Sequence, residues 1–439
     1  MVVSTYELGR PSFDVASAAA ELAAAGADVE ILDLSVGADL DRVAGARFVA
    51  FHVPMHTATR LAVSAARRVR ELAPGATRCF FGLYAPLNAE LLGRFGEVVG
   101  AEFEGDLVAA YRRTVGDHPP RPGRRRRFRV PDRSGFPPLE RYARLRLPSG
   151  ELRVAGATTT TRGCRHRCRH CPIVPVYRGR FVAVPAEVVI ADVRQQIAAG
   201  AEHLTFADPD FLNGPTHALR IVRRLHAAFP DLTYDVTIKV AHLLRHRRLL
   251  PTLRDTGCVL VTTAVESFDD RVLARLAKGH TAADAERALE VLAEVGIAAN
   301  PTFVPFTPWT TLEGYLGLLD RISELGLVGA VAPVQYAIRL LLPAGSRLLD
   351  LPEVAAVAGD FDPDALAHPW RHPDPDVDAL WREIDAVVRR EVGRDADRAA
   401  VFGEVRRRAL HAAGRPAPRA LEAVPDPVTV PYLTEPWYC

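Results

Sequence analysis

The chain lacks features that define several classes of protein. No uninterrupted apolar run in its 439 residues approaches the roughly 20 residues that a membrane-spanning helix needs. The formal net charge is only +2, so the charge balance calls for no nucleic-acid partner. Six cysteines without a secretory signal favour a reducing compartment over a disulfide-stapled secreted domain. We therefore expect a multidomain cytoplasmic enzyme without a membrane partner.

Lysine is almost absent. Only Lys239 and Lys278 occur among 55 lysine and arginine residues, which indicates a coding bias that replaces lysine wherever charge alone is needed. A lysine retained against this bias marks a position that requires an ammonium group, and chance retention is an equally good explanation. We treat Lys239 and Lys278 as candidate catalytic residues.

Three of the six cysteines lie close together. Cys164, Cys168 and Cys171 form a CxxxCxxC set directly after an apolar, strand-like run. Three thiolates at this spacing can hold one compact iron–sulfur cluster, but they are one ligand short of closing a four-iron cube. A metal site with an open position is typical of catalysis, because substrate or cofactor can fill the vacancy. A zinc site completed by His166 or His170, a disulfide, or thiols without a ligand are the alternatives.

This motif resembles the signature of the radical SAM superfamily, where CxxxCxxC follows the first strand of an alternating β/α region. The resemblance implies a [4Fe–4S] cluster held by Cys164, Cys168 and Cys171, with S-adenosylmethionine (SAM) bound to the open iron. It also implies reductive cleavage of a carbon–sulfur bond of SAM and an electron donor such as flavodoxin or ferredoxin. One position departs from the pattern: the residue before the third cysteine is usually aromatic and here is His170.

The sequence predicts an α/β protein in five parts. Residues 1–115 form a Rossmann-like parallel-sheet domain, because short apolar runs alternate with helical patterns. Residues 116–150 are a Pro/Arg-rich linker; binding of phosphate groups by its basic run is the alternative. Residues 151–350 form a partial (β/α)6 barrel, 351–415 a helical C-terminal region and 416–439 a Pro-rich tail ending in cysteine. The expected N-terminal strands are Met1–Tyr6, Val29–Leu34, Arg47–Val53, Thr77–Leu83 and Glu97–Glu102.

The N-terminal strand order, with Glu102-Phe-Glu-Gly105 after the fifth strand, resembles the cobalamin-binding domain that precedes the barrel in one radical SAM class. That class carries a cobalt-ligating histidine in the loop after its first strand. The corresponding segment here, Gly9–Phe13, contains no histidine. The resemblance therefore implies either cobalamin bound without a protein ligand or a domain retained for structure.

Polar residues follow the strands expected in the barrel. The carboxyl ends of parallel strands meet at one rim, where barrel enzymes carry their chemistry. The resemblance implies that Asp208 and Asp210 hold the SAM amino group and that Glu266 and Ser267 hold its ribose. Lys239 ends the third strand, and a role as helix cap or surface residue is the alternative for any single position. The candidate cofactor-binding residues are Asp208, Asp210, Glu266, Ser267, Gln335 and Arg339, and the expected strands are 154–161, 204–207, 234–240, 259–265, 298–304 and 329–335.

The C-terminus resembles that of the radical SAM proteins named for a CUAEP or CCAEP tail, as do the segments 131–139, 203–211, 305–311 and 338–343. Those proteins end in Glu-Pro-Trp-Tyr-Cys, then selenocysteine or cysteine, then Ala-Glu-Pro. This chain ends Leu433-Thr-Glu-Pro-Trp-Tyr-Cys439. We therefore expect a selenocysteine codon after Cys439 and a catalytic Cys439 that the Pro-rich tail carries to the barrel mouth. A tail whose cysteine has no role is the alternative.

Three functions follow from these patterns. Members resembling the subfamily transfer the 3-amino-3-carboxypropyl group of SAM to trivalent arsenic, so the leading prediction is a transferase for a small soft acceptor such as arsenic or selenium. Cobalamin-dependent methyl transfer is the alternative enzyme activity. A non-catalytic iron–sulfur or zinc protein that senses redox state is the third.

Overall fold

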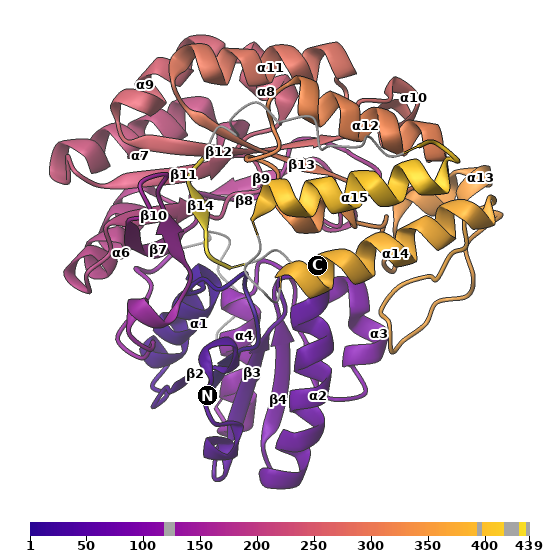
Figure 1. Ribbon diagram of the computed structural model, residues 1–439. Coiled ribbons are helices and arrows are strands. Elements are labelled where there is room, and N and C mark those ends of the chain that lie inside the picture. Colours follow the sequence, from indigo (N-terminus) through magenta and orange to yellow (C-terminus); the bar gives the residue numbers. More distant parts are fainter. Residues whose placement is uncertain (118–127, 393–396, 417–429, 436–439) are drawn as a thin grey trace.

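Short apolar runs near the N-terminus form the five-stranded parallel sheet that the sequence predicts. The structure is a computed structural model that describes residues 1–117, 128–392, 397–416 and 430–435. The sheet has the order β2-β1-β3-β4-β5. Helices α1 and α4 pack on one face and α2 on the other, as Figure 1 shows, so the central strands are buried on both sides. The elements are β1 (Val2–Ser4), α1 (Phe13–Ala24), β2 (Ile31–Asp33), β3 (Phe48–His52), α2 (His56–Leu72), β4 (Thr77–Phe81), α3 (Ala89–Leu92), β5 (Glu97–Val98) and α4 (Glu104–Thr114).

Five parallel strands form the wall of a partial barrel. They have the order β13-β12-β11-β10-β7, and their side chains make one continuous core with the helices outside. The strands are β7 (Leu152–Thr158), β10 (His203–Phe206), β11 (Thr233–Thr237), β12 (Cys258–Glu266) and β13 (Ala298–Phe303). The helices are α5 (Ile173–Tyr177), α6 (Ala186–Ala198), α7 (Pro215–Ala228), α8 (Val240–Arg245), α9 (Leu250–Asp255), α10 (Asp270–Arg275), α11 (Ala282–Val295) and α12 (Leu312–Glu324), with a hairpin of β8 (Thr161–Gly163) and β9 (Phe181–Ala183) after β7.

The sixth barrel strand, expected at 329–335, was predicted wrongly. The segment ends in a 3-10 turn, Pro333–Tyr336, and the only parallel bridge beyond β13 among the described residues joins Phe306 to Arg339. Pro333 has no N–H to give a strand ladder. The carbonyls of Gly329 and Ala330 instead accept hydrogen bonds from Arg398, at 2.8 and 3.3 Å. The α/β fold class itself is confirmed.

Segments from outside the predicted barrel extend its other edge. Strand β6 (Arg144–Arg146), within the predicted linker, pairs antiparallel with β7. Strand β14 (Tyr432–Leu433), within the predicted tail, pairs with β6. The helical C-terminal region comprises α13 (Pro352–Ala355), α14 (Pro375–Val392) and α15 (Arg398–Ala412), and the last two pack on the barrel beside α12 (Figure 1). A linker strand and a C-terminal strand thus extend the barrel sheet beyond β7.

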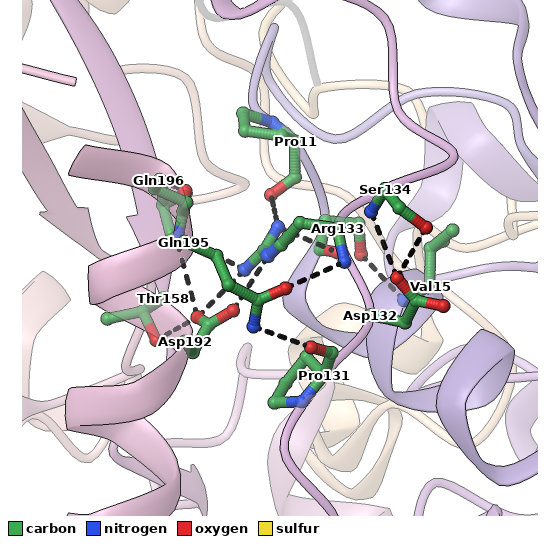
Figure 2. Close-up of polar contacts among 12 residues, drawn as sticks. Pro11, Val15, Pro131, Asp132, Arg133, Ser134, Thr158, Asp192, Gln195 and Gln196 are labelled. Atoms are coloured by element: carbon green, nitrogen blue, oxygen red, sulfur yellow. Dashed lines mark hydrogen bonds and ion pairs between the residues drawn. The ribbon is translucent and has the colours of Figure 1, made fainter. Parts of the chain in front are cut away.

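A buried arginine fastens the linker to both domains. Arg133 donates to both carboxylate oxygens of Asp192 on α6, at 2.7 and 2.9 Å (Figure 2). It also donates to the carbonyls of Pro11 in the N-terminal domain and Ala157 on β7, at 2.9 and 2.8 Å. Asp192 is fully buried, so the bidentate pair holds the domains in a fixed relation. No helix in the described part of the chain combines the length and apolar character that crossing a membrane requires.

Candidate functional site

Buried polar contacts hold the cysteine loop at the carboxyl end of the barrel. Asp208, just after β10, accepts hydrogen bonds from the backbone N–H and hydroxyl of Thr160 and the hydroxyl of Thr161, at 2.9, 2.6 and 2.6 Å. Asn213 accepts from the Arg165 N–H and donates to the Gly163 carbonyl, at 3.1 and 3.3 Å. The segment after β10 therefore positions the start of the loop before any cofactor binds.

The three candidate cluster cysteines are free thiols that lie close enough to affect one another's pKa. Cys168 is buried, and Cys164 and Cys171 are half-buried. Burial raises the pKa of Cys171 to about 12, and the neighbouring Cys168 and Cys164 raise it further. Burial also raises the pKa of Cys164, and Asp210 and Cys168 raise it further. Three sulfurs this close together repel one another as thiolates unless a cation holds them, so this donor set fits a cationic iron–sulfur cluster.

The two histidines inside the loop lie against carboxylates outside the loop. His166 Nε2 lies 3.2 Å from Asp210 Oδ2, and His170 Nε2 lies 3.2 Å from Glu266 Oε1. Burial lowers the pKa of His166, against the raising effect of Asp210. Both rings face carboxylates. This geometry does not favour a zinc site in which either histidine becomes the fourth ligand beside the three cysteines.

A buried ion pair stands beside the cysteines. Lys278 Nζ lies 3.0 Å from Glu266 Oε1, and Lys278 is 3% exposed. Burial alone would raise the pKa of Glu266, but Lys278 and His170 hold it well below its usual range. Glu266 has φ +68°, a strained left-handed conformation for a residue with a side chain. The cationic Lys278 also interacts with Cys168 and Cys171, so it can stabilise negative charge on a cluster held there.

The pKa values of the two aspartates after β10 are shifted in opposite directions. Burial raises the pKa of Asp208 to about 6, although the threonine hydrogen bonds offset part of the effect. Burial acts in the same direction on Asp210, but His166 and His242 outweigh it and lower its pKa. Both carboxylate oxygens of Asp208 thus accept hydrogen bonds from the start of the cysteine loop, whereas Asp210 faces two imidazoles.

The remaining candidate residues divide between the rim and other sites. Lys239 lies near the rim, since a side chain at Gly279 would approach its Nζ to 4.0 Å. Ser267 accepts a hydrogen bond from the Asp269 N–H at 3.0 Å. Gln335 accepts one from the Phe303 N–H at 2.8 Å. These assignments stay predictions.

Arg339 belongs to a different surface of the protein. It pairs with Asp378 at 2.7 Å, and its guanidinium lies 3.8 Å from the ring centre of Trp370 and 4.6 Å from that of Trp381. These partners come from the C-terminal region, and the cofactor-binding role of Arg339 stays a prediction. Cys439 lies outside the described residues.

A cavity of about 260 Å³ occupies the barrel interior. Alternate residues of β10 to β13 point into it, and the segment of β14 closes one side. Arg10 and Arg398 bring positive charges to its wall, and Asp235 and Glu435 bring negative ones. The polar lining residues that the strands supply are Thr205, Asp235, Thr237, Thr262, Asn300 and Thr302.

Several of these residues were missed by sequence reasoning. His242 sits one turn beyond Lys239, and its role shows only when α8 meets the segment after β10 and the cysteine loop. The polar cavity residues carried a usable signal, because polar residues at alternate positions of β11 and β13 have no place in a dry barrel core.

The comparison with known families agrees with this geometry. Residues 158–319 match the family described as the Radical SAM superfamily. The chain contains a radical SAM domain. Such a domain works with a [4Fe–4S] cluster and SAM, and the free thiols of the CxxxCxxC loop fit that cluster.

Solved structures show which fold accompanies this radical SAM domain. The cobalamin-dependent SAM radical enzyme OxsB, with aqua-cobalamin and SAM bound, aligns with a TM-score of 0.66 and 12% identity over 94% of this chain and 71% of that chain. The radical SAM methyltransferase TsrM from Kitasatospora setae, with cobalamin and a [4Fe–4S] cluster bound, aligns with a TM-score of 0.56 and 18% identity over 76% of this chain and 73% of its own. The N-terminal sheet therefore has a cobalamin-binding-like fold.

A curated relative covers less of the chain. The tRNA-2-methylthio-N(6)-dimethylallyladenosine synthase of Hahella chejuensis is 24% identical over 216 residues, 44% of this chain. The chain matches about 45% of the length of that relative.

The carboxyl edge of the N-terminal sheet does not fit a cobalamin held by a histidine. Arg162 fills this edge, donating to Asp14 at 2.7 Å and to Glu104 at 2.6 Å. His52, at the end of β3, is 1% exposed, and its ring nitrogens lie 3.6 Å from carboxylates of Glu7 and Asp14. The groove of about 710 Å³ alongside, between the loops after β4 and β5 and helix α5, has no histidine in its lining.

Proposed function

We propose that this chain is a SAM-cleaving transferase whose acceptor is a small polar molecule held inside the barrel, and that the transferred group is 3-amino-3-carboxypropyl. The observation that carries the acceptor class is the cavity of about 260 Å³, into which the barrel strands direct polar side chains. Its size suits a molecule of few heavy atoms, such as an oxyacid of trivalent arsenic or a small selenium compound. We propose a cytoplasmic location, with flavodoxin or ferredoxin as electron donor.

The chain's own residues would prepare the site for this chemistry. Cys164, Cys168 and Cys171 would hold the cluster, which supplies one electron to the SAM sulfonium when bound. Lys278 and Glu266 keep a fixed pair of charges beside the thiols. Asp208 fixes the loop through Thr160 and Thr161, so the cluster ligands need little reorganisation.

The cavity chemistry supports a neutral, hydroxylated acceptor. Threonine hydroxyls both donate and accept hydrogen bonds, as arsenite hydroxyls do. Asn300 already donates to the Thr262 hydroxyl at 3.1 Å, so the wall forms an ordered polar network. The last described residue, Glu435, lines the same cavity. The predicted catalytic Cys439 is four residues further along the chain.

Cobalamin-dependent methyl transfer is the second candidate. The fold shared with OxsB and TsrM supports it, and the groove beside the N-terminal sheet could take cobalamin without a protein ligand. The missing histidine and the Arg162 salt bridges count against it. The tRNA substrate of the curated relative finds little support, because the chain is nearly neutral and the cavity is small.

The test is anaerobic reconstitution of the cluster followed by SAM, a strong reductant and arsenite, with products identified by mass spectrometry. Methylthioadenosine and an arsenic species carrying the 3-amino-3-carboxypropyl group would support the proposal. 5′-Deoxyadenosine would contradict it and indicate hydrogen abstraction instead. S-Adenosylhomocysteine that forms only with added cobalamin would favour methyl transfer.

A matched pair of variants tests the cavity. Thr262→Val removes a hydroxyl that lines the cavity, and Thr263→Val removes one from the next residue, whose side chain is buried on the opposite face of β12. We expect T262V to raise KM for the acceptor about tenfold, the loss of roughly one hydrogen bond to a polar substrate. T263V should leave KM unchanged. Equal effects of both would contradict acceptor binding in the cavity.

A further inference from the structure

Three side chains beside the cysteine loop converge on one point. The ligand atoms of His166, Asp210 and His242 all lie within 4.8 Å of one another. Asp210 Oδ2 lies 2.8 Å from His242 Nδ1 and 3.2 Å from His166 Nε2. The residues come from the cysteine loop, the segment after β10 and helix α8, so only the folded barrel brings them together.

The converging atoms are buried and lack ordinary hydrogen bonds. Asp210 is 1% exposed, and its Oδ1 accepts from the Leu212 N–H at 3.1 Å, which fixes the direction of Oδ2. Asp210 Oδ2, His166 Nε2 and His242 Nδ1 have no hydrogen-bond partner of acceptable geometry. Asp210 Oδ2 lies within ion-pair distance of both ring nitrogens without a well-aligned hydrogen bond, so one cation at their meeting point could satisfy all three atoms.

We propose that His166, Asp210 and His242 bind a divalent transition-metal ion of the zinc or iron(II) class. Two imidazole nitrogens and one carboxylate oxygen form a donor set that such ions prefer. Three protein ligands leave at least one coordination position for a substrate heteroatom or water. The site contains no thiolate, which separates it chemically from the three cysteines.

The metal site would connect the cysteine loop to two strand ends. His166 lies between Cys164 and Cys168 in the sequence, so its coordination would restrain the loop that carries the thiols. The site also reassigns Asp210, since the oxygen predicted to hold the SAM amino group becomes a metal ligand. Measuring zinc affinity and SAM affinity separately therefore distinguishes Asp210 as a metal ligand from Asp210 as the partner of the SAM amino group.

The experiment titrates zinc into the anaerobically reconstituted, full-length holoprotein. We compare wild type with His242→Gln, whose position is remote in sequence from the cysteines. His246→Gln is the matched control, because His246 lies next to His242, with ring centres 5.4 Å apart, but outside the triad. We expect one equivalent of zinc for wild type and H246Q, and an affinity at least about tenfold lower for H242Q at unchanged cluster iron.

Cobalt(II) identifies the ligands. Bound at the triad, it should give visible d–d absorption without the thiolate-to-cobalt charge-transfer band that cysteine ligands produce. A thiolate band, or equal zinc affinity for wild type and H242Q, would overturn the proposal. The same follows if wild type binds no zinc and Asp210→Asn weakens SAM binding, because Asp210 then serves the SAM amino group.

Discussion

The two parallel sheets of this protein use their carboxyl edges in opposite ways. At the edge of the N-terminal sheet, Arg162 is 5% exposed and pairs with Asp14 and Glu104. At the edge of the barrel, free thiols crowd together, and Asp210 faces two imidazoles without a hydrogen bond at Oδ2. The paired charges at the N-terminal edge stabilise the interface between the domains. The groups at the barrel edge are arranged to bind a ligand.

The difference shows why a shared fold does not carry a shared cofactor. Both edges have the topology that binds ligands in open α/β sheets. Arg162 extends from β8 of the radical SAM domain into the neighbouring edge, so one side chain of the barrel closes the other domain's edge. The likeness to cobalamin-dependent enzymes therefore describes the fold, and the side chains decide what binds.

The largest contrast is expected between two cysteines. Cys168→Ala should abolish cluster assembly, because it leaves only Cys164 and Cys171 at the loop, and the other cysteines of the described residues, Cys79 and Cys258, lie on strands β4 and β12. Cys258→Ala, at an equally buried thiol on β12, should keep the cluster. Iron and sulfide content with the visible spectrum of the reconstituted protein measures both. Cluster retention in C168A would refute its role as ligand.

A smaller effect is expected at the closed edge. Arg162→Met leaves the Asp14 and Glu104 carboxylates without their cation, so the free energy of unfolding should fall by about 3–5 kcal/mol. Denaturant titration measures the change. Arg68→Met is the control, because Arg68 also pairs with two carboxylates, Asp41 and Glu71, but on an exposed surface. Its loss should leave stability almost unchanged, and an equal loss in both variants would remove the distinction between the sites.

The pH dependence of stability should have opposite signs at the two edges. The pKa of Asp208 is raised to about 6, so the folded protein retains this proton where the unfolded chain has lost it. Stability relative to Asp208→Asn should therefore fall by about 3 kcal/mol as pH rises from about 4 to 6. Urea titrations of both proteins across this range measure the difference, and a rise with pH would contradict the assignment.

Asp14 provides the counterpart. Burial would raise its pKa, but Arg162 outweighs this and lowers it to about 2. This contribution is complete above the ordinary pKa and is lost as pH falls from about 4 to 2, by about 2 kcal/mol. Arg162→Met should reduce this acid-dependent loss, because Arg162 makes the largest contribution to lowering the pKa and His52 makes a smaller one.

Local patterns predicted most elements of the fold. The capping box of Thr281 and Asp284 begins α11, and Gly296 ends it with φ +79°, as their positions indicate. All five N-terminal strands form within the expected runs. The sixth barrel strand failed because Pro333 removes a ladder donor and Arg398, 69 residues from Gly329 in the sequence, binds that carbonyl. Such a distant partner leaves no local signal.

The sequence by itself determined the chemistry of the three thiols, since CxxxCxxC brings its ligands together within eight residues whatever surrounds them. It also determined the alternation of strands and helices, through apolar periodicity. Only the tertiary structure decided that His242 meets Asp210 and His166, that Arg339 joins the C-terminal region, and that Arg162 closes the N-terminal edge. Those contacts join residues far apart in the chain, and burial and charge act on such neighbours only after the strands have assembled.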